Sequence, residues 1–194
     1  ALGIALAILM GRPRAPLPEG VLVIEPARYR DERGYFMEVW QQPRYGDAGM
    51  PTTFVQDNVS HSLQGVLRGL HYQWPHPQGK LLSVLQGRVY DVAVDIRQGA
   101  PTYGQWVGVE LDAATGRQVY VPEGFAHGFV VLSEAALVHY KCTRPYAPEC
   151  EHTIRWDDPT LAIDWPVDTP ILSDKDATAP RLHDLDEAAV PTRG

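Results

Sequence analysis

Short strand-like segments separated by glycine and proline corners constrain the fold of this chain more than any other feature. The stretch "KLLSVLQGRVYDVAVDIRQG" (80–99) reads as two strands broken at Gln86-Gly87. In the second strand, Val89, Asp91, Ala93 and Asp95 alternate with the intervening residues. Other segments of this kind recur at roughly the 8–12-residue spacing typical of sandwiches and barrels. They are 20–29, 54–62, 105–112, 117–124, 127–134 and 136–142.

Helical patterning is thin, with one turn expected in "PRYGDAGM" (43–50) and another after Asp174. The 17 glycines and 17 prolines are spread along the 194 residues, so no linker divides the chain. This pattern predicts a single all-β domain, a β-sandwich or jelly-roll barrel with a few short helices. The mouth of such a barrel can gather inward-facing polar side chains around a small ligand.

Charge and composition argue against several classes of protein, such as nucleic-acid-binding and membrane proteins. The net charge of −7 gives no basic footprint for nucleic acid, so an anionic ligand needs local Arg and Lys. Two cysteines, Cys142 and Cys150, do not make a disulfide framework and favour a reducing, cytoplasmic setting. The apolar opening "ALGIALAILMG" is too short to span a bilayer, so no membrane association is expected. We treat residues 1–18 as an N-terminal extension and 19–194 as the domain.

Polar residues that would be costly to bury in a barrel without a hydrogen-bond partner occur at a few places in the sequence. "RGLHYQWPHPQGK" (68–80) brings Arg68, His71 and Lys80 to a corner between strands. His127 lies between Gly124 and Gly128, which allow close backbone approach. Tyr140, Lys175 and Asp176 stand out near the end of a strand and in "LSDKDA" (172–177).

Each of these residues has a structural alternative. Tyr140 shares a strand face with Ala136 and Val138 and could simply cap the core. Arg33, in "DERGYF" (31–36), also fits a surface turn, and Lys175 with Asp176 fits an exposed ion pair of little energetic value. Judged singly, only His71 and Lys80 favour a functional role. The remaining histidines are assigned no role: His61, His76, His139, His152 and His183.

A metal site is not favoured by the histidine spacing. A metal-binding barrel of the cupin kind needs a His-x-His pair, a following carboxylate and a distant third histidine, whereas His71 and His76 are five residues apart. No glutamate follows at ligand spacing, and three or four convergent ligands would be required. No metal or other cofactor is therefore expected.

Several long motifs, in order, closely resemble the dTDP-4-dehydrorhamnose 3,5-epimerase family. They are "FVQDNVSHSLQGVLRGLHYQ", "QGKLLSV", "DVAVDIRQGAPTYGQWVGVEL", "VPEGFAHGFVVLSE", "YKCTRPYAPECEHTIRWDDP" and "LSDKDA". The resemblance runs from about residue 20 to about residue 185. It implies a dimeric, metal-independent cupin jelly-roll that epimerises a dTDP-4-keto-6-deoxyhexose at C3 and C5, on the way to dTDP-L-rhamnose.

The resemblance also implies catalytic roles. His71 matches the family's base, and an imidazole suits proton abstraction at neutral pH. Asp176 matches the carboxylate that orients it, as in other His–Asp pairs. Lys80 matches the cation beside the C4 oxygen, where enolate charge develops. Tyr140 matches the acid that returns a proton from the opposite face.

The remaining matches imply substrate binding, with arginine suited to phosphate oxygens. The residues are Arg33, Glu38, Gln56, Asp57, Asn58, Arg68, Lys80, His127, Tyr146, Glu151 and Lys175. Some of these contacts are expected from the partner subunit of a homodimer, whose N-terminal strands cross between subunits. Two departures need a structural check: Pro145 replaces a second aromatic, and a shorter 73–80 loop affects the reach of Lys80.

Three other functions remain as alternatives. A keto-isomerase on the same sugar nucleotide would need a similar base, but Tyr140 in its matched position argues against it. A non-catalytic binder would not need His71 and Tyr140. A metal-dependent oxygenase would contain stoichiometric metal and lose activity with a chelator. Product NMR separates the first of these from an epimerase directly.

Overall fold

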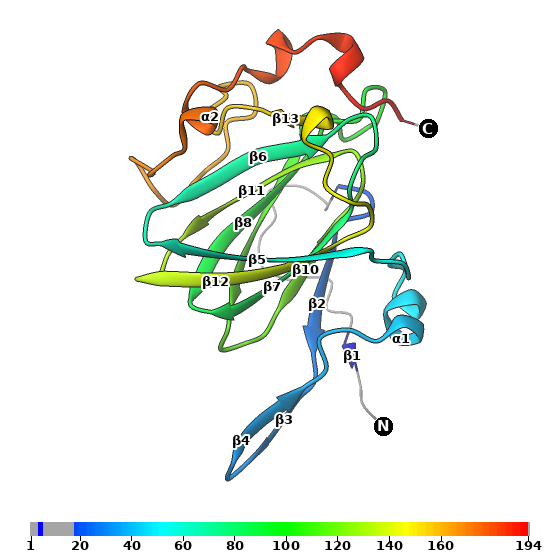
Figure 1. The fold of residues 1–194 in the computed structure, drawn as a ribbon, viewed down its shortest axis with the longest axis vertical. Coiled ribbons are helices and arrows are strands. Elements are labelled where there is room, and N and C mark those ends of the chain that lie inside the picture. Colours follow the sequence, from blue (N-terminus) through cyan, green and yellow to red (C-terminus); the bar gives the residue numbers. More distant parts are fainter. Residues whose placement is uncertain (1–3, 6–17, 194) are drawn as a thin grey trace.

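The computed structural model describes residues 4–5 and 18–193, and its strands form two facing antiparallel sheets (Figure 1). The six-stranded sheet runs in the order β1 (Ile4–Ala5), β2 (Leu22–Pro26), β10 (Gln118–Val121), β7 (Lys80–Gln86), β12 (Ala135–Cys142) and β5 (Gln56–Leu63). The five-stranded sheet runs β13 (Glu151–Thr153), β6 (Leu67–Gln73), β11 (Phe125–Val131), β8 (Arg88–Asp95) and β9 (Trp106–Asp112). Successive strands from β5 to β8 alternate between the sheets, as do β9 to β12, which gives the predicted jelly-roll sandwich.

The space between the sheets is filled by alternate side chains of the strands. Leu82 and Val84 of β7 and Ala136 and Val138 of β12 meet Phe129 and other residues of the opposite sheet, and all are buried. Strand alternation forces this arrangement, because every second side chain faces the same side of a sheet. The same inward faces continue toward one end of the sandwich as polar residues, and there they line a cleft.

Two segments cover the outer faces. The chain after β13 lies over the five-stranded sheet, where Leu161, Trp165 and Leu182 pack with Leu70 and Val92. It includes helix α2 (Asp174–Ala177) and the 3₁₀ turns Leu182–Asp184 and Glu187–Ala189; a third 3₁₀ turn, Pro148–Cys150, precedes β13. Helix α1 (Gln42–Asp47) covers part of the other sheet through the buried Tyr45.

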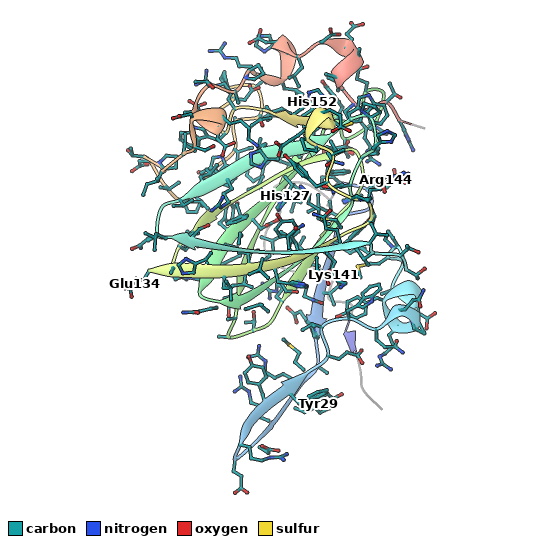
Figure 2. All side chains as sticks on the ribbon, in the orientation of Figure 1. Tyr29, His127, Glu134, Lys141, Arg144 and His152 are labelled. Carbon is teal, nitrogen blue, oxygen red and sulfur yellow. The ribbon has the colours of Figure 1, made fainter. Side chains whose placement is uncertain are left out.

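A two-stranded hairpin, β3 (Arg28–Asp31) and β4 (Gly34–Met37), projects away from the sandwich (Figure 1). It carries Tyr35 and Phe36, which are 53% and 63% exposed. Figure 2 shows Tyr29 on this hairpin, well apart from His127 inside the sandwich. The hairpin therefore has little to pack against within its own chain.

The predicted all-β class is confirmed, as is the strand break at Gln86-Gly87, which separates β7 from β8. The two expected helical turns correspond to α1 and α2. Of the predicted N-terminal extension, Ile4–Ala5 pair with β2, while residues 1–3 and 6–17 lie outside the described residues. Within the described residues, no helix has the length and apolar character needed to cross a membrane.

Candidate active site

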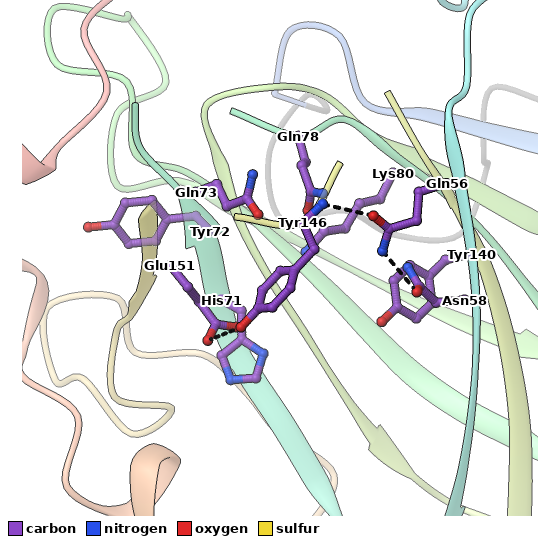
Figure 3. Close-up of a pocket in the computed structure, with 10 residues that line it drawn as sticks. All are labelled: Gln56, Asn58, His71, Tyr72, Gln73, Gln78, Lys80, Tyr140, Tyr146 and Glu151. Carbon is purple, nitrogen blue, oxygen red and sulfur yellow. Dashed lines mark hydrogen bonds between the residues drawn. The ribbon is translucent and has the colours of Figure 1, made fainter. Parts of the chain in front are cut away.

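Two adjoining compartments, of about 290 and 140 Å³, open between the sheets and share His71, Lys80 and Tyr140 among their lining residues. His71 comes from β6 in one sheet, whereas Lys80 and Tyr140 come from β7 and β12 in the other. Figure 3 shows His71 and Tyr140 on opposite sides of the cleft. The larger compartment is also lined by Gln56, Asn58, Tyr72, Gln73, Gln78, Tyr146 and Glu151. The smaller one is also lined by Ser60, Arg68, His127 and Phe129.

His71 is paired with a buried carboxylate. Its Nε2 lies 2.6 Å from Oδ1 of Asp176, whose side chain is 3% exposed. Asp176 is held in place because Ser173 caps α2, its hydroxyl accepting from the Asp176 backbone N–H. Burial alone would raise the pKa of Asp176, but the hydrogen bond and charge of His71 hold it below its usual range. The carboxylate thus stays ionised and orients the imidazole.

Burial shifts the pKa values of the two other shared residues, Lys80 and Tyr140, in opposite directions. Burial lowers the pKa of Lys80 below 10.5, with Cys142 and Glu151 opposing that shift. Burial raises the pKa of the Tyr140 phenol, so it is fully protonated at neutral pH. Among the described residues, neither the Lys80 ammonium nor the Tyr140 hydroxyl has a hydrogen-bond partner. Because Lys80 lines both compartments, the length of the 73–80 loop does not prevent it from reaching the cleft.

A β-bulge turns Arg68 and His71 to the same side of β6. In a regular strand, residues three apart face opposite sides. Here His127 pairs with His71 and Phe129 pairs with Arg68, so three steps on β6 match two on β11. Gly69 makes this possible with a φ of +135° and by close contact: an added Cβ would lie 2.5 Å from the Gly128 Cα.

A second His–Asp pair lies beside the first. Nε2 of His127 is 2.8 Å from Oδ2 of Asp91 on β8, and both side chains are buried. His127 is the cross-strand neighbour of His71. The sheet thus presents two imidazoles side by side, each backed by a carboxylate from another segment.

Polar side chains at the mouth form a connected set (Figure 3). The Tyr146 hydroxyl donates to Oε2 of Glu151 at 3.0 Å, and the Lys175 ammonium donates to the same oxygen at 2.9 Å. Burial alone would raise the pKa of Glu151, but Lys175 and Tyr146 hold it below its usual range. Gln56 accepts from the Tyr146 N–H and donates to Asn58, so the residue after Pro145 is anchored in this structure.

Three predicted binding residues lie away from the cleft. Asp57 faces the outside of β5, where Lys141 donates to it at 2.8 Å, because it alternates with Gln56 and Asn58. Arg33 is 85% exposed and pairs with Asp31 at the hairpin turn. Glu38 is paired with Arg44 of α1. Within one chain, Arg33 therefore adopts the surface-turn position that the sequence also allowed.

Several residues in or directly behind the cleft were not identified from the sequence: the lining residues Ser60, Tyr72, Gln73, Gln78 and Phe129, and Asp91, which pairs with His127. Asp91 did carry a signal, because it alternates with Val89 and Ala93, both of which face the core. A carboxylate on an apolar strand face needs a partner. In the described part of the chain, no three His, Cys, Asp or Glu side chains cluster as metal ligands do.

Comparisons with known proteins identify the family to which the chain belongs. The family model described as dTDP-4-dehydrorhamnose 3,5-epimerase matches residues 17–184. This chain belongs to that family. The 3,5-epimerase of Pseudomonas aeruginosa is 51% identical over 179 residues, covering 91% of this chain and 98% of the relative. As a family member, the chain is an isomerase with the cupin-type fold of its relatives.

Two solved structures of relatives contain bound sugar nucleotides. The dTDP-6-deoxy-D-glucose-3,5-epimerase of Legionella pneumophila, in complex with dTDP-4-keto-L-rhamnose, matches this epimerase with a TM-score of 0.90 and 49% identity, covering 100% of both chains. ChmJ from Streptomyces bikiniensis, a 3′-monoepimerase in complex with dTDP-quinovose, matches with a TM-score of 0.85 and 37% identity over 90% of each chain. The fold is thus shared by relatives that act at one carbon and relatives that act at two.

Proposed function

We propose that this epimerase converts dTDP-4-dehydro-6-deoxy-D-glucose to dTDP-4-dehydro-L-rhamnose by inverting C3 and C5 of the sugar. The observation that carries the proposal is the cleft itself. A carboxylate-backed imidazole on one sheet faces a protonated phenol on the other, and the same space is lined by a lysine that has no hydrogen-bond partner among the described residues. Inversion needs a base and an acid on opposite faces of the sugar ring, and this arrangement supplies both.

One base can serve both carbons, because the hydrogens at C3 and C5 are each α to the C4 ketone. His71 takes a proton from one of these carbons, and the electron pair moves onto the C4 oxygen as an enolate. Tyr140 then donates its phenolic proton to the opposite face of the same carbon. Solvent removes the proton from His71 and returns one to Tyr140, so the cycle balances for each centre.

Lys80 is assigned to the C4 oxygen. A fixed positive charge in a water-poor cleft stabilises the enolate more than the neutral ketone, which lowers the barrier rather than only tightening binding. The absence of an acidic hydrogen-bond partner for Lys80 among the described residues supports this role, since its charge is not already neutralised.

The remaining cleft residues are assigned to substrate binding. The mouth of the cleft, where a nucleotide would fit, is surrounded by Tyr146, Gln56, Asn58, Glu151 and Lys175. Arg68 and His127 line the smaller compartment and are assigned to the diphosphate. Arg68 donates through Nε to Ser62, which leaves its other N–H groups for phosphate oxygens.

A homodimer accounts for the residues that lie outside the cleft. The projecting hairpin holds Arg33 and exposed aromatic residues away from its own sandwich, in position to reach another subunit. The outer face of β5 and the end of β7 also carry Val59, Leu63 and Leu85, which are 49–60% exposed. A cluster of exposed apolar side chains is typical of a subunit interface. We assign Arg33 and Glu38 to the partner's nucleotide site.

The cytoplasm is the proposed compartment. Cys142 and Cys150 are both free and buried, which suits a reducing environment.

A time course of the keto sugar nucleotide in heavy water, followed by proton NMR, tests the proposed reaction. We expect deuterium at both C3 and C5 and a product with the L-rhamno configuration. Labelling at C3 alone would identify a mono-epimerase, the activity of the ChmJ relative. Migration of the carbonyl from C4 to C3 would identify a keto-isomerase instead.

A further inference from the structure

Ser60 has a buried hydroxyl that no neighbouring group satisfies. Its Oγ is one of three buried side-chain atoms without a hydrogen-bond partner among the described residues. The others are the Arg28 Nε on the hairpin and the Tyr72 hydroxyl, which points away from the cleft (Figure 3). A buried unpaired hydroxyl costs free energy, and at a binding site a group of the bound ligand can supply the missing hydrogen bond.

The position of Ser60 in the cleft limits which group of the substrate can hydrogen-bond its hydroxyl. It lines the smaller compartment together with Arg68 and His127, assigned to the diphosphate, and His71 and Tyr140, assigned to proton transfer. The diphosphate is attached to C1 of the sugar, and the two reacting carbons lie equally far from it, C3 across C2 and C5 across the ring oxygen. Of these two intervening atoms, only C2 carries a hydroxyl in a 4-keto-6-deoxyhexose.

Ser62 lies two residues further along the same strand face as Ser60, and its hydroxyl does have a hydrogen-bond partner. Its Oγ accepts from the Arg68 Nε at 2.9 Å, and the side chain is buried. Ser60 has no comparable partner although it lies between Ser62 and Asn58 on the inward face of β5. Arg68 is thus oriented by one serine, while the other remains available to the substrate.

We propose that the Ser60 hydroxyl hydrogen-bonds the C2 hydroxyl of the sugar and makes the enzyme selective for substrates that carry it. This inference rests on the proposed function. The C2 hydroxyl is the one ring hydroxyl whose carbon is not inverted, so a contact to it holds the ring while C3 and C5 change configuration. Ser60 is a specificity-determining residue and takes no part in proton transfer.

The test compares two substrates and three proteins. The substrates are the dTDP-4-keto-6-deoxyhexose and its 2-deoxy analogue, and kcat/KM is measured for each. We expect the native enzyme to prefer the 2-hydroxy substrate by roughly tenfold or more, and Ser60→Ala to lose most of that preference by slowing only the 2-hydroxy substrate. Ser83→Ala is the control, because the Ser83 hydroxyl bonds Gln118 away from the cleft and the preference should persist.

Three results would overturn the inference. The first is a native enzyme that processes both substrates equally well, a result that needs no variant to fold. The second is an unchanged preference in Ser60→Ala. The third is weaker binding of dTDP itself by Ser60→Ala, measured by calorimetry, which would assign the hydroxyl to the diphosphate. Failure of the proposed function looks different, because neither substrate would then be epimerised by the native protein.

Discussion

His71 and Tyr140 carry different halves of the proposed reaction, so their variants should fail in different ways. His71→Ala removes the base, and we expect turnover to fall by about 10²–10⁴-fold together with deuterium exchange. Tyr140→Phe removes only the returning proton, so epimerisation should fall while much of the exchange at C3 persists. Parallel NMR measurements of exchange and product formation distinguish the two. Equal loss of both activities in Tyr140→Phe would contradict its role as the acid.

Lys80 should set an alkaline limit on activity. Burial lowers the pKa of its ammonium, so the free enzyme loses this charge as pH rises to a value below the 10.5 of an ordinary lysine. In the proposed mechanism the charged form stabilises the enolate, and kcat/KM should therefore decline over that range. Lys80→Arg should keep some activity and move the decline to higher pH, because arginine stays charged. A pH profile that does not change in Lys80→Arg would exclude this assignment.

We predict that Asp91 is a positioning residue for His127. Asp91→Asn keeps the shape but removes the buried charge that faces Nε2, so His127 should hold the substrate less well. We expect KM to rise by roughly tenfold with a smaller change in kcat, as for loss of a charged hydrogen bond. Asp157→Asn, which breaks an exposed pair with Arg155, is the matched control. A fall in kcat with KM unchanged would place His127 in the chemistry instead.

At the scale of strands, Gly69 is the residue on which the cleft most depends. Gly69→Ala introduces a Cβ 2.5 Å from the Gly128 backbone at a φ of +135°, which only glycine adopts readily. We expect a loss of roughly 2–4 kcal/mol in the free energy of unfolding, with a large loss of turnover as Arg68 and His71 separate. Gly99→Ala also has a positive φ, of +80°, but open space around the new Cβ, so it should cost only about 1 kcal/mol and leave turnover intact.

Strand positions were predictable because alternation and glycine corners are local features, and β7 to β12 follow the predicted segments closely. The alternation of strand residues also indicates on which side of the sheet Asp57 and Asp91 lie, although neither position was predicted from it. It places Asp57 opposite to Gln56 and Asn58, and it turns Asp91 toward the core. The bulge at Gly69 could not be predicted this way, because it depends on the approach of β11, more than 50 positions further along the chain. The projecting hairpin was missed because, among the described strands, β3 and β4 pair only with each other and lie outside the two main sheets.

For the whole molecule, the proposed exchange of Arg33 between subunits can be tested by mixing two inactive variants. Arg33→Ala and His71→Ala each damage a different part of a shared site. In a mixed dimer, one of the two sites combines a native His71 with a native Arg33. Random re-association of equal amounts should therefore restore about one quarter of native activity. No recovery after confirmed subunit exchange would show that Arg33 serves its own chain or none.

The acid and the base are attached to different sheets, and this has a mechanical consequence. The gap that a sugar ring must fit is the local thickness of the sandwich, which Leu82, Val84, Phe129 and Val138 set as spacers. Trimming one of these spacers would let the layers settle toward each other and shift a proton donor relative to an acceptor without touching either. Hydrophobic residues that do not line the cleft, Leu82, Val84 and Val138, thus help to set the distance between the acid and the base.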